Sequence, residues 1–138
     1  MVTSPLTTVA ARRLAGVAAV LALLAVAAGA FGAHALDDRL SARGKEVYEI
    51  AVRSQMYHAL ALFAVAAWVR RGVRGAGLAA RLMLGGIAVF SGSLYALAAT
   101  DVKALGAVTP FGGAALLAAW SILAINLLRS DDSAMIEP

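Results

Sequence analysis

The sequence of 138 residues contains no cysteine, and only 14% of its residues are charged. Without cysteine the chain has no disulfide, no thiolate nucleophile and no thiolate metal ligand. The net charge is only +4, and the arginines lie at the ends of apolar segments, which is not the pattern of a nucleic-acid-binding groove. We therefore expect no nucleic-acid partner and no cofactor.

Catalytic motifs are also missing. The sequence has no Gly-x-Ser-x-Gly elbow, no phosphate-binding glycine loop and no carboxylate in the middle of an apolar segment. Ser91 and His58 are a conceivable nucleophile and base, but no third residue is placed to orient the histidine. His34, with Asp37 or Asp38 beside it, falls short of a zinc ligand set. The sequence predicts that the protein is not an enzyme and holds no metal.

Apolar residues, in contrast, make up 62% of the chain, which is more than a soluble domain of this size can bury. They gather in four segments, each about long enough to cross a hydrocarbon core as a helix. We predict an all-α fold, an integral membrane four-helix bundle in the lipid bilayer. Its single membrane domain covers residues 14–128, with a cytoplasmic segment at 1–13 and a disordered acidic tail at 129–138. The predicted spans are residues 14–36, 47–69, 82–100 and 110–128.

The first span has a rival interpretation as a secretory signal peptide. Arg12 and Arg13 fit its basic region, and Ala33-His34-Ala35 fits a small-x-small cleavage site. Residues 14–36, however, exceed the roughly 7 to 15 residues of a typical signal-peptide core. We therefore favour a membrane span.

Charged residues of both signs alternate between the first two spans. Leu36, Leu40, Val47 and Ile50 recur there at loose helical spacing, which predicts a short amphipathic helix at the membrane surface, broken at Gly44. The second span reaches full length only if Arg53 lies near the headgroups, where Glu49 can pair with it. Later in the chain, Thr109 and Pro110 predict the N-cap and first turn of the fourth span.

Basic residues are unevenly divided between the two sides of such a bundle. Five of them fall on the side of the first loop: Arg39, Arg43, Lys45, Arg53 and Lys103. Seven fall on the side of the termini: Arg12, Arg13, Arg70, Arg71, Arg74, Arg81 and Arg129. For a bacterial inner-membrane protein, which is the location that we expect, this bias predicts that both termini lie in the cytoplasm. The margin is small, so an inverted or dual orientation stays open at this point.

Four motifs resemble one known family. They are GAFGAH at 29–34, VRSQMYHALAL at 52–62 after Tyr48, FSGSLY at 90–95, and LGAVTPFGG at 105–113 followed by Trp120. In this order they resemble the YgdD-like family of small inner-membrane proteins, which includes transmembrane protein 256 and is largely of unknown function. The sequence departs from the family pattern at Ser54, where an aromatic residue is usual, and at Asp101, where glycine is usual. The resemblance implies a four-helix membrane protein and supplies no reaction.

Polar residues inside the predicted spans form the candidate site. Helical rise brings them to a similar depth on the side of the first loop, so we expect them to meet in one layer. The residues are Gln55, His58, Ser91, Tyr95 and Thr109. We favour a structural interpretation in which they hydrogen-bond the helices together. The alternative is a functional layer in which His58 carries a proton or holds a polar ligand.

Two functional hypotheses follow. The first is a non-enzymatic structural or partner-binding module that packs against itself or another membrane protein through stripes of small residues, with Gly29, Gly85 and Gly92 as the packing positions. The second is a small transporter or ligand-binding protein that uses the polar layer around His58.

Overall fold

The computed structural model describes residues 5–36 and 38–129, and within these ranges it contains four helices and no strand. The helices are α1 (Pro5–His34), α2 (Ala42–Arg70), α3 (Ala76–Thr100) and α4 (Ala104–Arg129). Each is long and apolar enough to cross a membrane, by length and composition. The prediction of an all-α fold with four candidate spans is confirmed. The predicted disordered tail lies almost entirely outside the described residues.

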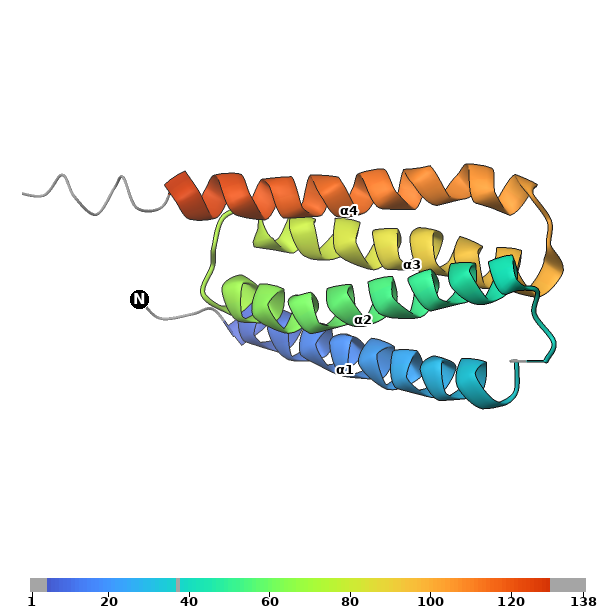
Figure 1. The fold of residues 1–138 in the computed structure, drawn as a ribbon. Coiled ribbons are helices and arrows are strands. Elements are labelled where there is room, and N and C mark those ends of the chain that lie inside the picture. The colour runs from blue at the N-terminus through green and yellow to red at the C-terminus, as the bar shows by residue number, and fades with distance from the viewer. Residues whose placement is uncertain (1–4, 37, 130–138) are drawn as a thin grey trace, which may run out of the picture.

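The helices run alternately up and down, in the order in which they occur in the chain (Figure 1). α1 packs on α2, α2 on α3, and α3 on α4, and no comparable contact joins α1 to α4 among the described residues. The start of α1, the α2–α3 turn and the end of α4 lie at one end of the array (Figure 1). The α1–α2 and α3–α4 connections lie at the other end. α2 and α3 are therefore the inner helices, and α1 and α4 are the outer ones.

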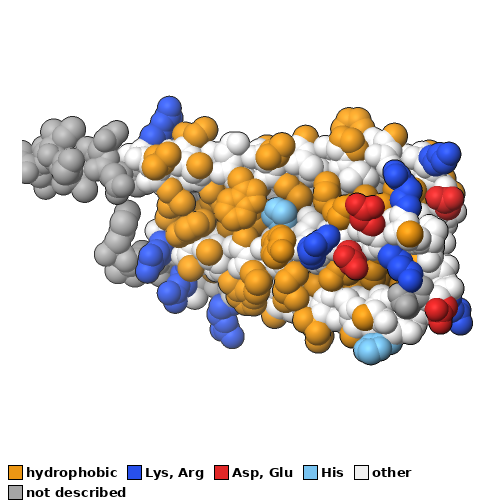
Figure 2. All heavy atoms as spheres, in the orientation of Figure 1, with side chains coloured by type: hydrophobic (Ala, Val, Ile, Leu, Met, Phe, Trp, Pro, Cys, Tyr) orange, Lys and Arg blue, Asp and Glu red, His pale blue; other side chains and the backbone are white. Residues whose placement is uncertain are grey.

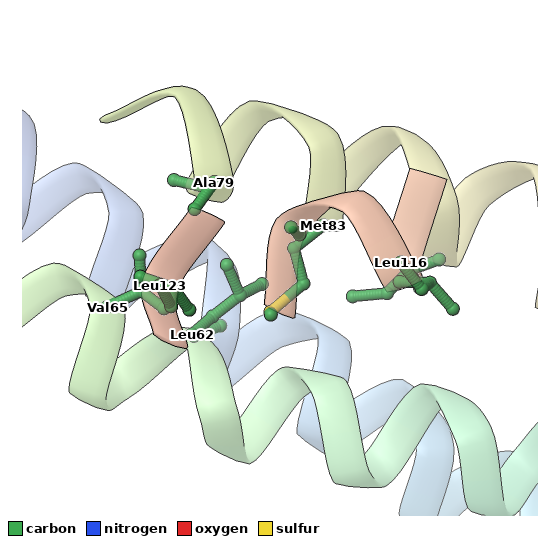
Figure 3. Close-up of a cluster of buried hydrophobic side chains, with 10 residues drawn as sticks. Leu62, Val65, Ala79, Met83, Leu116 and Leu123 are labelled. Carbon is green, nitrogen blue, oxygen red and sulfur yellow. The ribbon is translucent and has the colours of Figure 1, made fainter. Parts of the chain in front are cut away.

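The apolar core lies where α2, α3 and α4 meet. Leu62 of α2 and Met83 of α3 are fully buried in it, and Leu116 and Leu123 reach it from α4 (Figure 3). The outer helix α1 contributes one buried side chain to this cluster, that of Ala18, and its partly buried Leu14 and Leu21 pack against the cluster. Its other buried residues, Ala11 and Ala25, are each seven positions away from Ala18, which is the spacing of a helix packed along one narrow seam. Alanines along the seam let the backbone of α1 lie close to α2.

The connection between α1 and α2 differs from the prediction. No amphipathic helix separates them in the described residues: the chain turns after Leu36, where the Leu40 N–H donates to the Leu36 carbonyl at 3.1 Å, and α2 begins at Ala42. Ser41 is the N-cap, and its Oγ accepts a hydrogen bond from the Gly44 N–H at 3.1 Å. Because this cap satisfies the Gly44 N–H, Gly44 lies in the first turn of α2, where we expected a break. Residues 42–49, the later part of the charged stretch that suggested a separate helix, form the first two turns of α2.

The start of α4 was also predicted wrongly. α4 begins at Ala104, so Thr109 is not an N-cap and Pro110 lies inside the helix. Proline lacks the N–H that would bond to the carbonyl four residues earlier, that of Gly106. This missing bond falls within the first two turns of α4, close to the exposed end of the helix. Leaving the Gly106 carbonyl without this bond costs less free energy there than in the middle of a helix.

The two other turns require left-handed backbone. Gly72 and Gly75, between α2 and α3, have φ of +72° and +78°, which glycine adopts without strain. Asp101 ends α3 with φ of +56° and is the one described residue other than glycine with positive φ. This is the position at which the resembled family has glycine, and the helix end explains that preference.

Charge divides the molecule into two unlike ends. The seven arginines counted above lie at the end that holds the α2–α3 turn, and no acidic residue accompanies them among the described residues. The opposite end carries five basic residues together with Asp38, Glu46, Glu49 and Asp101. Figure 2 shows acidic side chains at only one end of the visible face. We call the first the arginine end and the second the mixed-charge end.

Candidate functional site

Gln55 is the polar residue that joins the most helices. It lies on the inner face of α2 and is 7% exposed. Its Nε2 donates a hydrogen bond to the Leu21 carbonyl of α1 at 2.8 Å, and its Oε1 accepts one from the Tyr95 hydroxyl of α3 at 3.0 Å. One side chain therefore uses both ends of its amide to connect α1, α2 and α3.

Tyr48 extends this network toward the mixed-charge end. Its hydroxyl donates to the Ala28 carbonyl at 2.8 Å, and its ring meets the ring of Tyr95 edge to face with centroids 5.2 Å apart. Gly32 makes room for it, because a Cβ at that position would lie 2.6 Å from Tyr48 Cε1. The sequence analysis did not select Tyr48 or Gly32. The sequence did contain a signal for Tyr48. It stands seven residues before Gln55, which places the side chains of Tyr48 and Gln55 on one face of a helix.

A second polar contact joins α3 to α4. The hydroxyls of Ser93 and Thr109 lie 2.8 Å apart and share a hydrogen bond, and Ser93 also contacts the Phe90 carbonyl at 3.0 Å. Thr109 was selected from the sequence for this region, whereas Ser93 was missed. Ser91 is 1% exposed, and its Oγ has no hydrogen-bond partner within the described part of the chain.

His58 lies apart from both contacts. Its Nδ1 is 2.8 Å from the Ser54 carbonyl, and because a carbonyl can only accept, Nδ1 carries the proton and donates. Its ring lies 6.2 Å from the ring of Trp120 on α4, centroid to centroid. Three residues along a helix turn the side chain by about 60° from that of Gln55. The structure thus brings Gln55 to Tyr95 and Thr109 to Ser93, and it places His58 in neither of these pairs.

The glycines selected for helix packing lie in different surroundings. A Cβ at Gly29 would make ordinary contact with Val52 of α2, at 3.5 Å. A Cβ at Gly85 or Gly92 would meet no described atom within 4 Å, so both glycines lie on the outer face of α3. Ala88, between them, is exposed as well.

Two other glycines allow α3 and α4 to approach. A Cβ on Gly112 would overlap the Phe90 backbone nitrogen and lie 2.7 Å from Phe90 Cα. A Cβ on Gly86 would lie 2.6 Å from Leu116 Cδ2 and 3.2 Å from the Gly112 carbonyl oxygen. Gly86 and Gly112 were missed because each stands beside a second glycine, at positions 85 and 113, and the sequence does not show which member of a pair faces the partner helix.

The described part of the chain does not gather its histidines into a metal-ligand cluster. Within residues 5–36 and 38–129, no group of three His, Asp or Glu side chains is placed to hold a metal ion. His34 is exposed at the end of α1. Asp37, one of its two suggested co-ligands, lies outside the described residues.

Residues 28–113 match the model of the family described as "Protein of unknown function (DUF423)". The UPF0382 membrane protein YwdK of Bacillus subtilis is 42% identical over 113 residues, which are 80% of this chain and 92% of that protein. A UPF0382 membrane protein of Staphylococcus epidermidis is 43% identical over 78% of this chain and 88% of its own length. One from Haemophilus influenzae is 39% identical over 76% and 85%. No solved structure matches the chain significantly.

Proposed function

The chain belongs to the DUF423 family of membrane proteins of unknown function, and we propose that it is a non-enzymatic membrane module that associates with a second copy of itself through the outer face of α3. The family relationship confirms the expectation of a small membrane protein family without an assigned function. The four apolar helices agree with the relatives' description as membrane proteins.

The internal hydrogen bonds support a structural role for the polar residues. Gln55 uses both ends of its amide within the chain, and the hydroxyls of Tyr95, Ser93 and Thr109 bond to other helices of the same chain. Polar side chains that are satisfied in this way hold membrane helices together. A site for a transported or bound polar molecule needs groups that are free to exchange partners. The alternative, a transporter or ligand-binding protein built around His58, has less support, because His58 lies outside these pairs.

The outer face of α3 carries the proposal of self-association. We define the small-residue face as Gly85, Ala88 and Gly92, which are exposed at spacings of three and four. The chain uses Gly86 and Gly112 for its own close helix approach, and Gly85 and Gly92 make no such contact with the described residues. Small residues at such spacing allow two membrane helices to pack closely, and a face of this kind is self-complementary about a two-fold axis. A second copy is therefore the occupant that fits it best.

Because the natural chain lacks cysteine, crosslinking can test the association without background. In native membranes, Gly85→Cys and Gly92→Cys should each give disulfide-linked dimers upon oxidation, since the two positions would face their counterparts across the axis. Leu24→Cys, on the exposed face of α1, is the matched control and should give little dimer. Gly85→Leu introduced with Gly92→Cys should abolish the crosslink. Equal crosslinking at positions 24 and 92, or none at 85 and 92, would contradict the proposal; crosslinks to another protein alone would point to a different partner.

We further propose that the protein lies in the bacterial inner membrane with the arginine end in the cytoplasm. Supporting this, arginines flank the membrane there without acidic residues among the described ones, and basic residues near short loops favour the cytoplasmic side. The start of α1 and the end of α4 belong to that end (Figure 1). A reporter that is active only in the cytoplasm, fused after Pro138, should be active, and an inactive fusion would argue for the inverted orientation.

A further inference from the structure

A groove opens between the last turns of α1 and the first turns of α2, at the mixed-charge end. Its volume is about 320 Å³. The floor comes from α1 and is almost without side chains, because it consists of Gly29, Gly32 and Ala33. The wall is formed by one connecting residue and one side of α2: Leu40, Lys45, Tyr48, Glu49, Val52 and Arg53. We call this feature the α1–α2 groove.

The inner part of the groove is apolar. Tyr48 contributes its ring, because its hydroxyl is already bonded to the Ala28 carbonyl on α1. Val52 lies beside Gly29, with 3.5 Å between Val52 Cγ1 and a Cβ placed on the glycine. A hydrocarbon chain can therefore lie against this part of the groove without removing a polar group from water.

The rim of the groove is charged in an ordered way. Lys45, Glu49 and Arg53 follow one another at intervals of four residues, so they lie along one face of α2 in the order positive, negative, positive. Arg53 Nη2 and Glu49 Oε2 are 3.9 Å apart, and the two side chains are 58% and 69% exposed. Such an exposed ion pair contributes little stability. A ligand can therefore bind Arg53 or Glu49 in place of its present partner with little loss of free energy. The guanidinium of Arg53 in particular offers several N–H donors to an oxyanion.

The position of the groove along α2 matches the headgroup layer. Arg53 and Arg70 bound the apolar stretch of α2, and the 17 steps between them rise about 25 Å in a helix. This is close to the hydrocarbon thickness of about 30 Å, so Arg53 lies near the boundary between acyl chains and headgroups. The rim of the groove then faces headgroups, and only the part of its floor at Gly29, beside Val52, is level with the start of the acyl chains.

We propose that the α1–α2 groove binds a phospholipid whose headgroup carries an ammonium group next to its phosphodiester, as phosphatidylethanolamine does. Arg53 binds the phosphate oxygens, Glu49, one turn closer to the mixed-charge end, receives the ammonium, and the first part of an acyl chain lies against Val52 beside Gly29. Glu49 provides the selectivity, because a phosphate that binds Arg53 takes the cation with which Glu49 is paired, and only a headgroup with an ammonium group supplies a replacement for it.

Native mass spectrometry of the full chain in detergent micelles, with added phosphatidylethanolamine or phosphatidylglycerol, tests this proposal. The unmodified chain should retain phosphatidylethanolamine more strongly than phosphatidylglycerol. Arg53→Gln should weaken retention by about tenfold, the effect of losing one charge-assisted hydrogen bond. Arg70→Gln, at the other end of the same helix, is the matched control and should leave retention unchanged. Equal retention by the unmodified chain and Arg53→Gln would overturn the proposal.

Two more variants separate the headgroup from the groove. Glu49→Gln should abolish the preference for phosphatidylethanolamine over phosphatidylglycerol while still binding both, and a preference that survives this change would show that Glu49 does not select the headgroup. Ala33→Trp, at an exposed floor position, should fill the groove and reduce retention of both lipids with the helix content unchanged. Glycerophosphoethanolamine, which has no acyl chains, should compete poorly; competition as strong as that of the full lipid would overturn the lipid assignment in favour of a soluble phosphate ester.

Discussion

The two outer helices are attached to the bundle in different ways. α1 is held by polar side chains of α2, since Gln55 and Tyr48 donate hydrogen bonds to the main-chain carbonyls of Leu21 and Ala28. α4 shares one hydrogen bond with α3, between the Thr109 and Ser93 hydroxyls, but its closest contact is backbone proximity, since Gly112 leaves no room for a Cβ beside Phe90 of α3. In both contacts, a helix surface with few large side chains packs against the neighbouring helix. The first uses a directional polar contact and the second uses close van der Waals packing.

This difference shows how a chain so rich in alanine forms specific contacts between its helices. Alanine-lined surfaces fit many rotations of a helix about its axis, so they specify none of them well. A hydrogen bond to one carbonyl, or a crossing point that admits only glycine, selects a single rotation. The predictions below test each kind of contact, starting with the one whose loss should cost the most.

Gly112→Ala should cause the largest loss of stability. The added Cβ overlaps the Phe90 backbone, which cannot move without shifting α3 against α4. We expect the free energy of unfolding, measured in mixed detergent and SDS, to fall by about 3 kcal/mol. Gly113→Ala is the matched control, because its Cβ would lie 3.6 Å from the Phe90 ring. That variant should be as stable as the unmodified chain or slightly more so, owing to the better helix propensity of alanine. Equal effects at both positions would show that the glycine crossing does not hold α4.

Gln55→Leu should have an intermediate effect. It removes the hydrogen bond to Leu21 and leaves the hydroxyl of the half-buried Tyr95 without its acceptor. We expect a loss of about 2 kcal/mol in the same unfolding measurement. Tyr95→Phe removes only one of the two bonds and should cost about 1 kcal/mol. The comparison would fail if His58→Phe, which alters a residue outside this network, destabilised the protein as much as Gln55→Leu.

Asp101→Gly should have the smallest effect and the opposite sign. Asp101 has φ of +56° at the end of α3, and glycine adopts this conformation without the steric cost of a Cβ. We expect a gain of about 1 kcal/mol in unfolding free energy. Asp101→Ala keeps the Cβ and removes the carboxylate, so it should give no gain. A gain in both variants would assign the effect to charge, and the α3–α4 turn would then not be a strained point of this half of the molecule.

Several features of the fold could be predicted from the sequence. Segments of about 20 apolar residues must be helical in a membrane, because the main chain has no other way to pair its N–H and C=O groups there. The first residues of α2 and α4 were less predictable. Ser41 caps α2 within a stretch that looked like a separate surface helix, and Pro110 is tolerated inside α4 although proline usually marks a first turn. α2 begins directly after Ser41 and continues through Gly44, where we expected a break. α4 begins at Ala104, before the Thr109-Pro110 pair that we took as its start.

The candidate site was less predictable than the fold for a geometric reason. Sequence spacing and rise place polar residues at the right depth, and Gln55, Tyr95 and Thr109 do form contacts between helices. Depth does not decide which neighbour a side chain meets. Gln55 and His58 differ by about 60° around α2, and this difference directs one toward α1 and α3 and the other toward Trp120 of α4.

By itself the sequence determined the class of the protein, the number of its helices and the division of charge between its ends. These follow from composition and from the length of apolar runs, which act on each segment separately. Only the tertiary structure decided which glycine of a neighbouring pair faces a helix and which faces outward. Gly85 and Gly86 are adjacent in sequence but about 100° apart around α3, and with alanine on nearly every side no local pattern selects between them. The choice is made by the fit of whole helices, which brings Gly86 against Leu116 and leaves Gly85 and Gly92 open.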